Sequence, residues 1–93
     1  LSPGRIEEAI LRDPAVRRCC VVGAPDADLG EVPVAFVVTR DGASVQPRAI
    51  QDRVGAELPR TYVPARIIVL ESLPEIGIGK VDRGELKRLA ENA

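Results

Sequence analysis

The 93-residue sequence contains no histidine, and Phe36 and Tyr62 are its only aromatic residues. Without histidine, the chain cannot hold a histidine-based catalytic triad or one of the usual zinc sites. Two adjacent cysteines do not make a metal site, so we expect none in this chain. Basic runs and aromatic platforms are also missing, and the formal net charge is −1. These absences argue against nucleic acid as a partner.

Long apolar runs are missing as well. No stretch approaches the length of about 20 residues that a membrane-spanning helix needs, and the N-terminus lacks the regions of a signal peptide. Cys19 and Cys20 lie side by side within an apolar run. Neighbouring side chains on a strand point to opposite faces, so a disulfide between them would be strained. We therefore expect two buried free thiols, a reducing compartment and a cytoplasmic location.

The length and the apolar patterning predict one small α+β domain, too small for a deep substrate cleft of its own. Three helices and three strands are expected, in the order α-β-β-α-β-α, with the helices packed on a small three-stranded sheet. In chain order, they are a helix ended by Asp13-Pro14, strands at 16–23 and 32–39, a helix at 47–58, a strand at 66–70, and a helix after Asp82.

Local signals add detail to this outline. We expect the first two strands to form an antiparallel hairpin around a turn at 25–31, and the strand at 66–70 to be buried. Ser2 is expected to cap the first helix, with Glu7 and Glu8 solvated in its first turns. Asp82 and Glu85 have the spacing of a capping box, which we favour over a role in acid–base catalysis.

A glycine-punctuated loop precedes the last helix and carries a lysine. Gly77 and Gly79 allow positive φ and a close approach of the backbone to a ligand, and Lys80 offers a point charge for a phosphate or carboxylate. The segment is not a Walker phosphate loop, because Pro74 and Val81 replace the required glycine and hydroxyl residue. On spacing alone, a solvated turn is the simpler interpretation. However, the chain has only two lysines among its 13 basic residues.

Four segments together resemble the small C-terminal domain of the adenylate-forming superfamily, which includes acyl-CoA synthetases, luciferases and nonribosomal peptide synthetase adenylation domains. The segments follow the family's order and spacing, and the resemblance extends over essentially all of the chain. The four segments are 2–7 (Ser-Pro-x2-Ile-Glu), 23–38 (Gly-x-Pro-Asp-x3-Gly-Glu, then Val-Ala-Phe-Val-Val from 34), 58–66 (Leu-Pro-x3-Val-Pro-Ala-Arg) and 73–83 (Leu-Pro-x4-Gly-Lys-Val-Asp-Arg).

The resemblance implies that Lys80 is the catalytic lysine of acyl-adenylate formation, with Gly77 and Gly79 letting its loop reach the nucleotide. It implies that ATP, Mg²⁺ and the carboxylic acid substrate are bound mainly by a large N-terminal domain. Residues 1–93 would be the C-terminal subdomain of a longer enzyme. The hinge and the start of the motif that opens this subdomain would precede Leu1, and we expect the subdomain alone to be inactive. A thiol would then displace AMP after the domain rotates.

Several alternatives stay open. The acceptor could be coenzyme A or the phosphopantetheine of a carrier protein, as in nonribosomal peptide synthetases. The domain could also be a recognition module whose Lys80 is modified by a lysine acetyltransferase, or a plain interaction domain. Arg83 could serve the nucleotide, the domain interface or only the surface, and residues 25–31 could face the large domain.

The chain also departs from the family's usual pattern. Ile76 and Ile78 stand where relatives carry hydroxyl or amide residues, Thr61 stands where tyrosine is common, and Arg5 stands where glutamate is usual. The resemblance therefore does not imply hydroxyl contacts from this loop. None of these departures involves Lys80.

Overall fold

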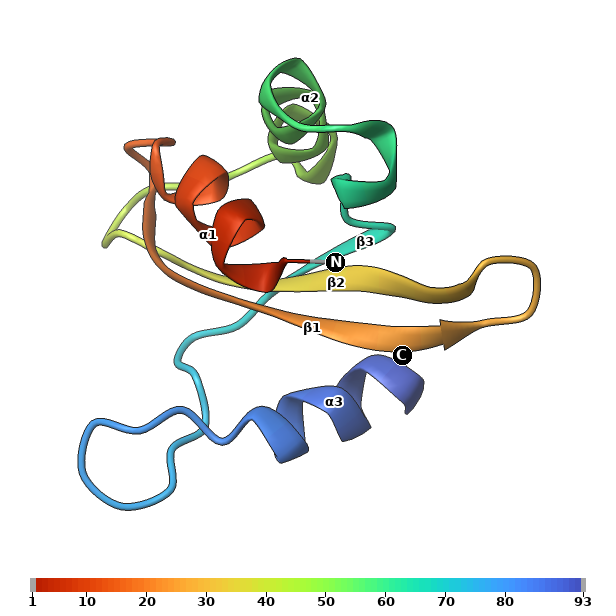
Figure 1. Cartoon of the computed structure of the whole chain (residues 1–93). Coiled ribbons are helices and arrows are strands. Elements are labelled where there is room, and N and C mark those ends of the chain that lie inside the picture. Colours follow the sequence, from red (N-terminus) through yellow and green to blue (C-terminus); the bar gives the residue numbers. More distant parts are fainter. Residues whose placement is uncertain (1, 93) are drawn as a thin grey trace.

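The computed structural model describes residues 2–92 and has a three-stranded sheet at its centre (Figure 1). Strand β1 (Val16–Asp26) pairs antiparallel with β2 (Gly30–Thr39), and β3 (Arg66–Val69) pairs parallel with β2 on its other side. The strand order is β1-β2-β3. This arrangement confirms the expected hairpin, the α+β class and the order of the elements.

The β1–β2 turn is shorter than the sequence predicted. The ladder extends to the pair Asp26–Gly30, so only residues 27–29 lie outside the strands. The Asp26 carboxylate accepts the backbone N–H groups of Asp28 and Leu29, both at 2.9 Å, and Gly30 adopts a φ of 81°. An Asx turn followed by a left-handed glycine reverses the chain within a few residues. The predicted turn at 25–31 was therefore wrong at both ends.

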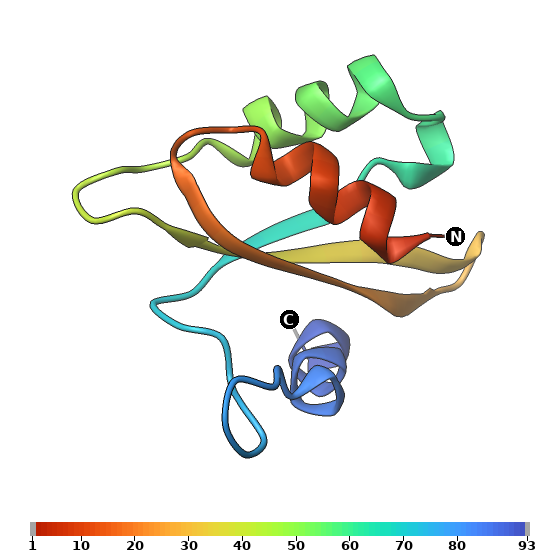
Figure 2. The ribbon, with the colours of Figure 1, turned by 60° about the vertical axis from the view of Figure 1, so that its left-hand side comes forward.

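Helices cover both faces of the sheet (Figures 1 and 2). Helices α1 (Pro3–Leu11) and α2 (Pro47–Glu57) pack on one face, where Ile6, Ile10 and Val54 join alternate residues of β1 and β2. Helix α3 (Arg83–Asn92) packs on the opposite face. The fully buried Phe36 lies in that second cluster. Because both faces of the sheet are covered, β1 and β2 carry buried apolar side chains on both sides.

Strand β3 is only partly buried, contrary to the expectation of a buried strand. It lies at the edge of the sheet, so β2 is its only neighbour among the described strands. A short 3-10 helix (Arg60–Tyr62) precedes it and was not predicted.

Two of the expected helix caps differ from the prediction. Ser2 occupies the N-cap position of α1, but its side chain makes no capping hydrogen bond. Asp82 does cap α3, since its carboxylate accepts the N–H of Glu85 at 3.0 Å. The reciprocal hydrogen bond of the capping box, from the backbone N–H of Asp82 to the Glu85 carboxylate, is absent. The Glu85 carboxylate instead accepts hydrogen bonds from the Arg88 guanidinium at 2.6 and 3.0 Å. That contact also lowers the pKa of Glu85.

Glu8 is exposed, as expected, but Glu7 is not simply solvated. The Glu7 carboxylate accepts the backbone N–H of Val21 on β1 at 2.7 Å, across the α1–β1 interface. Both cysteines are free, which confirms the expected thiols, although only Cys20 is buried and Cys19 is half-buried. No helix within residues 2–92 is long and apolar enough to cross a membrane.

Candidate functional site

The glycine loop folds into a small hairpin, here called the Lys80 hairpin and comprising residues 74–82. Glu75 and Val81 form an antiparallel bridge, the Ile76 N–H donates to the Lys80 carbonyl at 2.7 Å, and the Asp82 N–H donates to the Pro74 carbonyl at 2.8 Å. In Figure 1, this segment projects from the body of the domain, at the end opposite the β1–β2 turn. The predicted loop is therefore a hydrogen-bonded element.

The two predicted glycines shape the tip of this hairpin. Gly77 has a φ of 67° and Gly79 a φ of 72°, values in the left-handed region that residues with a Cβ rarely adopt. A Cβ built on either glycine would meet no atom within 4 Å. Within this domain, their role is therefore the turn itself. Close approach of their backbone to a nucleotide stays a prediction.

The hairpin is tethered to the domain at both of its ends. Leu73, on one side, is only 4% exposed and packs among the residues between the sheet and α3. On the other side, Asp82 caps α3. Lys80 thus lies close to two anchored points, which agrees with the predicted placement between a strand and a capped helix.

Lys80 is exposed, and within residues 2–92 its side chain makes no hydrogen bond or ion pair. The carboxylate of Glu75, in the same hairpin, lies 3.7 Å from the guanidinium of Arg18 instead. The other lysine differs, since the Lys87 ammonium lies 4.0 Å from the Glu31 carboxylate. The Lys80 ammonium is therefore available to an anionic ligand from outside the domain. The exposed Ile78, rather than the lysine, forms the tip of the hairpin.

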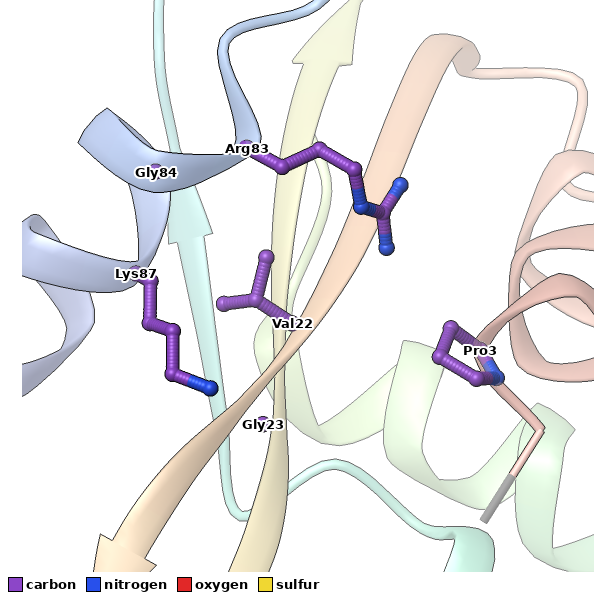
Figure 3. Close-up of a pocket in the computed structure, with 6 residues that line it drawn as sticks. All are labelled: Pro3, Val22, Gly23, Arg83, Gly84 and Lys87. Atoms are coloured by element: carbon purple, nitrogen blue, oxygen red, sulfur yellow. The ribbon is translucent and has the colours of Figure 1, made fainter.

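The side chain of Arg83 extends across strand β1 (Figure 3). Its guanidinium donates to the Val21 carbonyl at 2.6 Å and to the Cys20 sulfur at 3.2 Å, and it lies 3.7 Å from the Glu7 carboxylate. These contacts link α3 to β1 and α1. Sequence reasoning left the role of Arg83 open and treated Glu7 as solvated. The position of Glu7 beside Ile6, on the edge of the apolar face of α1, was the available signal.

A hollow of about 280 Å³ lies next to Arg83, bounded by β1 and the start of α3 (Figure 3). Its lining includes Arg83 and Lys87 but neither Lys80 nor the two hairpin glycines. The predicted site residues thus lie on a projecting hairpin and not in this hollow. Among residues 2–92, no cluster of three or more His, Cys, Asp or Glu side chains could hold a metal ion.

Comparison with known proteins gives a consistent family assignment. The sequence model described as the AMP-binding enzyme C-terminal domain matches residues 5–80. An acetyl-coenzyme A synthetase of Deinococcus radiodurans is 36% identical over 97% of the chain, and a trans-cinnamate:CoA ligase of Petunia hybrida is 35% identical over 99%. The solved structure of ATP-bound MatB from Rhodopseudomonas palustris superposes on 99% of the chain with a TM-score of 0.94, at 28% identity.

The chain spans only 14%, 16% and 18% of the lengths of these three proteins, respectively. The matches confirm the resemblance seen in the sequence motifs, and the matched region ends at Lys80 itself. The chain belongs to the family of AMP-binding enzyme C-terminal domains.

Proposed function

We propose that this domain is the mobile C-terminal part of an AMP-forming acyl-CoA synthetase or acyl-AMP ligase, and that Lys80 is its catalytic lysine. The observation that carries the proposal is an ammonium group without a partner within residues 2–92, on a hairpin anchored at both ends. Relatives that match nearly the whole chain are named as a CoA ligase and an acetyl-coenzyme A synthetase, and they are several times longer. Their greater length supports a large N-terminal domain as the main partner.

The chemistry explains why such a lysine is useful. In the adenylation half-reaction, a carboxylate oxygen attacks the α-phosphorus of ATP, and pyrophosphate leaves to give the acyl-adenylate. Two anions must approach each other, and negative charge gathers between them. An ammonium placed there holds both groups and stabilises the charge in the transition state. The unpaired Lys80 ammonium could do this without first breaking an ion pair.

The nucleotide and its Mg²⁺ are assigned mainly to the N-terminal domain. Residues 2–92 offer no group of three or more His, Cys, Asp or Glu side chains that could hold a metal ion, which supports this assignment. The contribution of this chain is then the positioning of Lys80 by the hairpin that Gly77 and Gly79 allow. ATP as the nucleotide is supported by the ATP-bound relative.

In the second half-reaction, a thiol sulfur attacks the acyl carbon and AMP leaves. We propose coenzyme A as the acceptor, because the relatives are named as a CoA ligase and an acetyl-coenzyme A synthetase. A carrier-protein phosphopantetheine is the alternative, because segment 58–66 resembles one that is best known in nonribosomal peptide synthetases. The domain would rotate as a rigid body between the two steps, which removes Lys80 from the acyl group.

The half-reactions provide the test. In a full-length enzyme carrying this domain, Lys80→Ala should reduce adenylation strongly and largely spare thioester formation from supplied acyl-adenylate. Lys87→Ala is the matched control, because Lys87 is the only other lysine and pairs with Glu31. Rates would be measured as pyrophosphate release and as thioester yield. Equal losses in both half-reactions of Lys80→Ala would contradict the assignment.

Acetylation of Lys80 is a second proposal, favoured by the exposure of this side chain. Acetylation would remove the charge on which adenylation depends. Incubation with a lysine acetyltransferase and acetyl-CoA, followed by mass spectrometry, should find Lys80 modified and adenylation reduced. If Lys80 stays unmodified while other sites react, this regulatory role is contradicted.

We also propose a cytoplasmic location for the parent enzyme. Two free thiols are compatible with a reducing compartment.

A further inference from the structure

The Lys80 hairpin is attached to strand β1 near both of its ends. On the first arm, Glu75 lies 3.7 Å from Arg18 of β1. Directly after the second arm, Arg83 reaches back over the same strand to the Val21 carbonyl at 2.6 Å. A hairpin held on one arm could pivot about that attachment, whereas attachment on both arms restricts its direction. The contacts of Arg83 are the stronger of the two sets.

Glu7 explains why Arg83 is well placed. Its carboxylate accepts the Val21 N–H at 2.7 Å, while Arg83 bonds the carbonyl of the same residue. The same carboxylate oxygen lies 3.7 Å from the guanidinium. The backbone of Val21 thus orients both side chains. The side chain of Glu7 is only 23% exposed and that of Arg83 is 52% exposed, so solvent screens the pair only in part.

Cys20 completes this polar group, since Arg83 also donates to its sulfur at 3.2 Å. Burial is the largest influence on this thiol and raises its pKa, so the thiol stays neutral at physiological pH. The contact is therefore a hydrogen bond from a cation to a neutral sulfur. One arginine thus joins α3, β1 and α1, and it stands three positions after Lys80 (Figure 3).

We propose that Arg83 is a positioning residue for adenylation. It fixes the direction of the Lys80 hairpin by anchoring its second arm to Val21 and Glu7. This inference rests on the proposed role of Lys80. A misplacement of a reacting group by about 1 Å costs up to roughly 100-fold in rate. Losing this anchor should therefore reduce the rate of the step that uses Lys80, without removing any group that touches the substrates.

The test compares two arginines of the same helix in a full-length enzyme carrying this domain. Arg83→Met removes the anchor, and Arg88→Met is the matched control, because Arg88 pairs only with Glu85 on the exposed surface. Arg83→Lys keeps the charge but loses the forked contacts, so we expect partial rescue. Glu7→Gln, alone and with Arg83→Met, tests whether the two residues act as one unit.

We expect Arg83→Met to lower the kcat of pyrophosphate release by about 10- to 100-fold, with the KM for ATP nearly unchanged. Thioester formation from supplied acyl-adenylate should stay close to that of Arg88→Met. Glu7→Gln should add little to the loss caused by Arg83→Met. A merely structural role would instead lower both half-reactions together with the melting temperature.

The outcomes separate this inference from the proposed function. An inactive Lys80→Ala enzyme beside a fully active Arg83→Met enzyme would overturn the inference alone. Equal losses in both half-reactions of Arg83→Met would also overturn it. An active Lys80→Ala enzyme would overturn the proposed function and the inference with it. If Arg83→Met does not fold, Arg83→Lys and Glu7→Gln carry the same comparison.

Discussion

At the scale of single residues, Cys19 is a partly buried ionisable group, whereas Lys80 is exposed. Burial, with smaller contributions from Glu7 and Cys20, raises the pKa of Cys19 from 9.0 to about 12. The folded chain therefore holds this proton more tightly than the unfolded chain. The resulting stabilisation is complete below pH 9 and is lost as the pH rises from 9 towards 12. Cys19 should thus be an unreactive thiol at neutral pH.

This linkage gives a pH-dependent prediction. The free energy of unfolding of the 93-residue chain should fall more steeply above pH 9 than that of Cys19→Ser, which has no comparable ionisation. Urea titrations of both proteins between pH 7 and pH 11 would measure the difference. Parallel stability curves over that whole range would show that the Cys19 thiol is not shielded from ionisation.

Lys80, Gly77 and Gly79 could be proposed as site residues from sequence because they lie within one short motif, and their roles stay predictions. The Arg83–Glu7 contact could not be predicted, because it joins the two ends of the chain and depends on how α1 and α3 meet β1. The position of Glu7 on the edge of the apolar face of α1 indicates that it could contact the domain, but the sequence does not identify the partner of its carboxylate. The Val21 N–H that binds Glu7 is visible only in the fold.

At the scale of elements, the Lys80 hairpin depends on its left-handed glycines. Gly79→Ala should destabilise the chain by about 1–2 kcal/mol, because a Cβ is strained at a φ of 72° although no neighbouring atom blocks it. Gly79→Asn should cost less, since asparagine tolerates this conformation. Urea unfolding would measure both changes.

Gly4→Ala provides the matched control for that experiment. Gly4 lies in α1, also has open space around its Cβ position, and has no positive φ. Alanine should be neutral or slightly stabilising there. Equal effects at Gly4 and Gly79 would mean that the hairpin does not require its left-handed turn.

Helix existence followed from sequence more reliably than the ends of strands. Pro3 and Pro47 each begin a helix, as their fixed φ predicts, and the apolar spacing of Ile50 and Val54 identified the buried face of α2. The β1–β2 turn was misjudged because proline, aspartate and glycine indicate a turn without giving its length. The side chain of Asp26 and the φ of Gly30 decide that length.

At the scale of the whole molecule, the three-stranded sheet separates helices α1 and α2 from helix α3. Strands β1 and β2 bury side chains on both faces of the sheet. The α+β class was predictable from the order of helices and strands that the apolar patterning indicates. The parallel pairing of β3 with β2 and the side on which each helix packs were not predicted, because they depend on contacts between distant segments. The result places the Lys80 hairpin at one end of the domain and the β1–β2 turn at the other (Figure 1).

This layout suits a domain that acts on a partner domain. The unpaired ammonium projects on an anchored hairpin, while the core contains no buried charged or polar side chain among residues 2–92. Rotation of the whole domain could then bring Lys80 to the reacting groups or remove it from them, without rearrangement of the core.

The most direct test of the central claim is pyrophosphate release by a full-length enzyme carrying this domain, measured across a panel of carboxylic acids. Wild type, Lys80→Ala and Lys87→Ala would be compared. The account predicts release with at least one acid, near-complete loss in Lys80→Ala, and wild-type rates in Lys87→Ala. Robust release by Lys80→Ala would contradict it and would leave the hairpin as a solvated turn on an interaction domain.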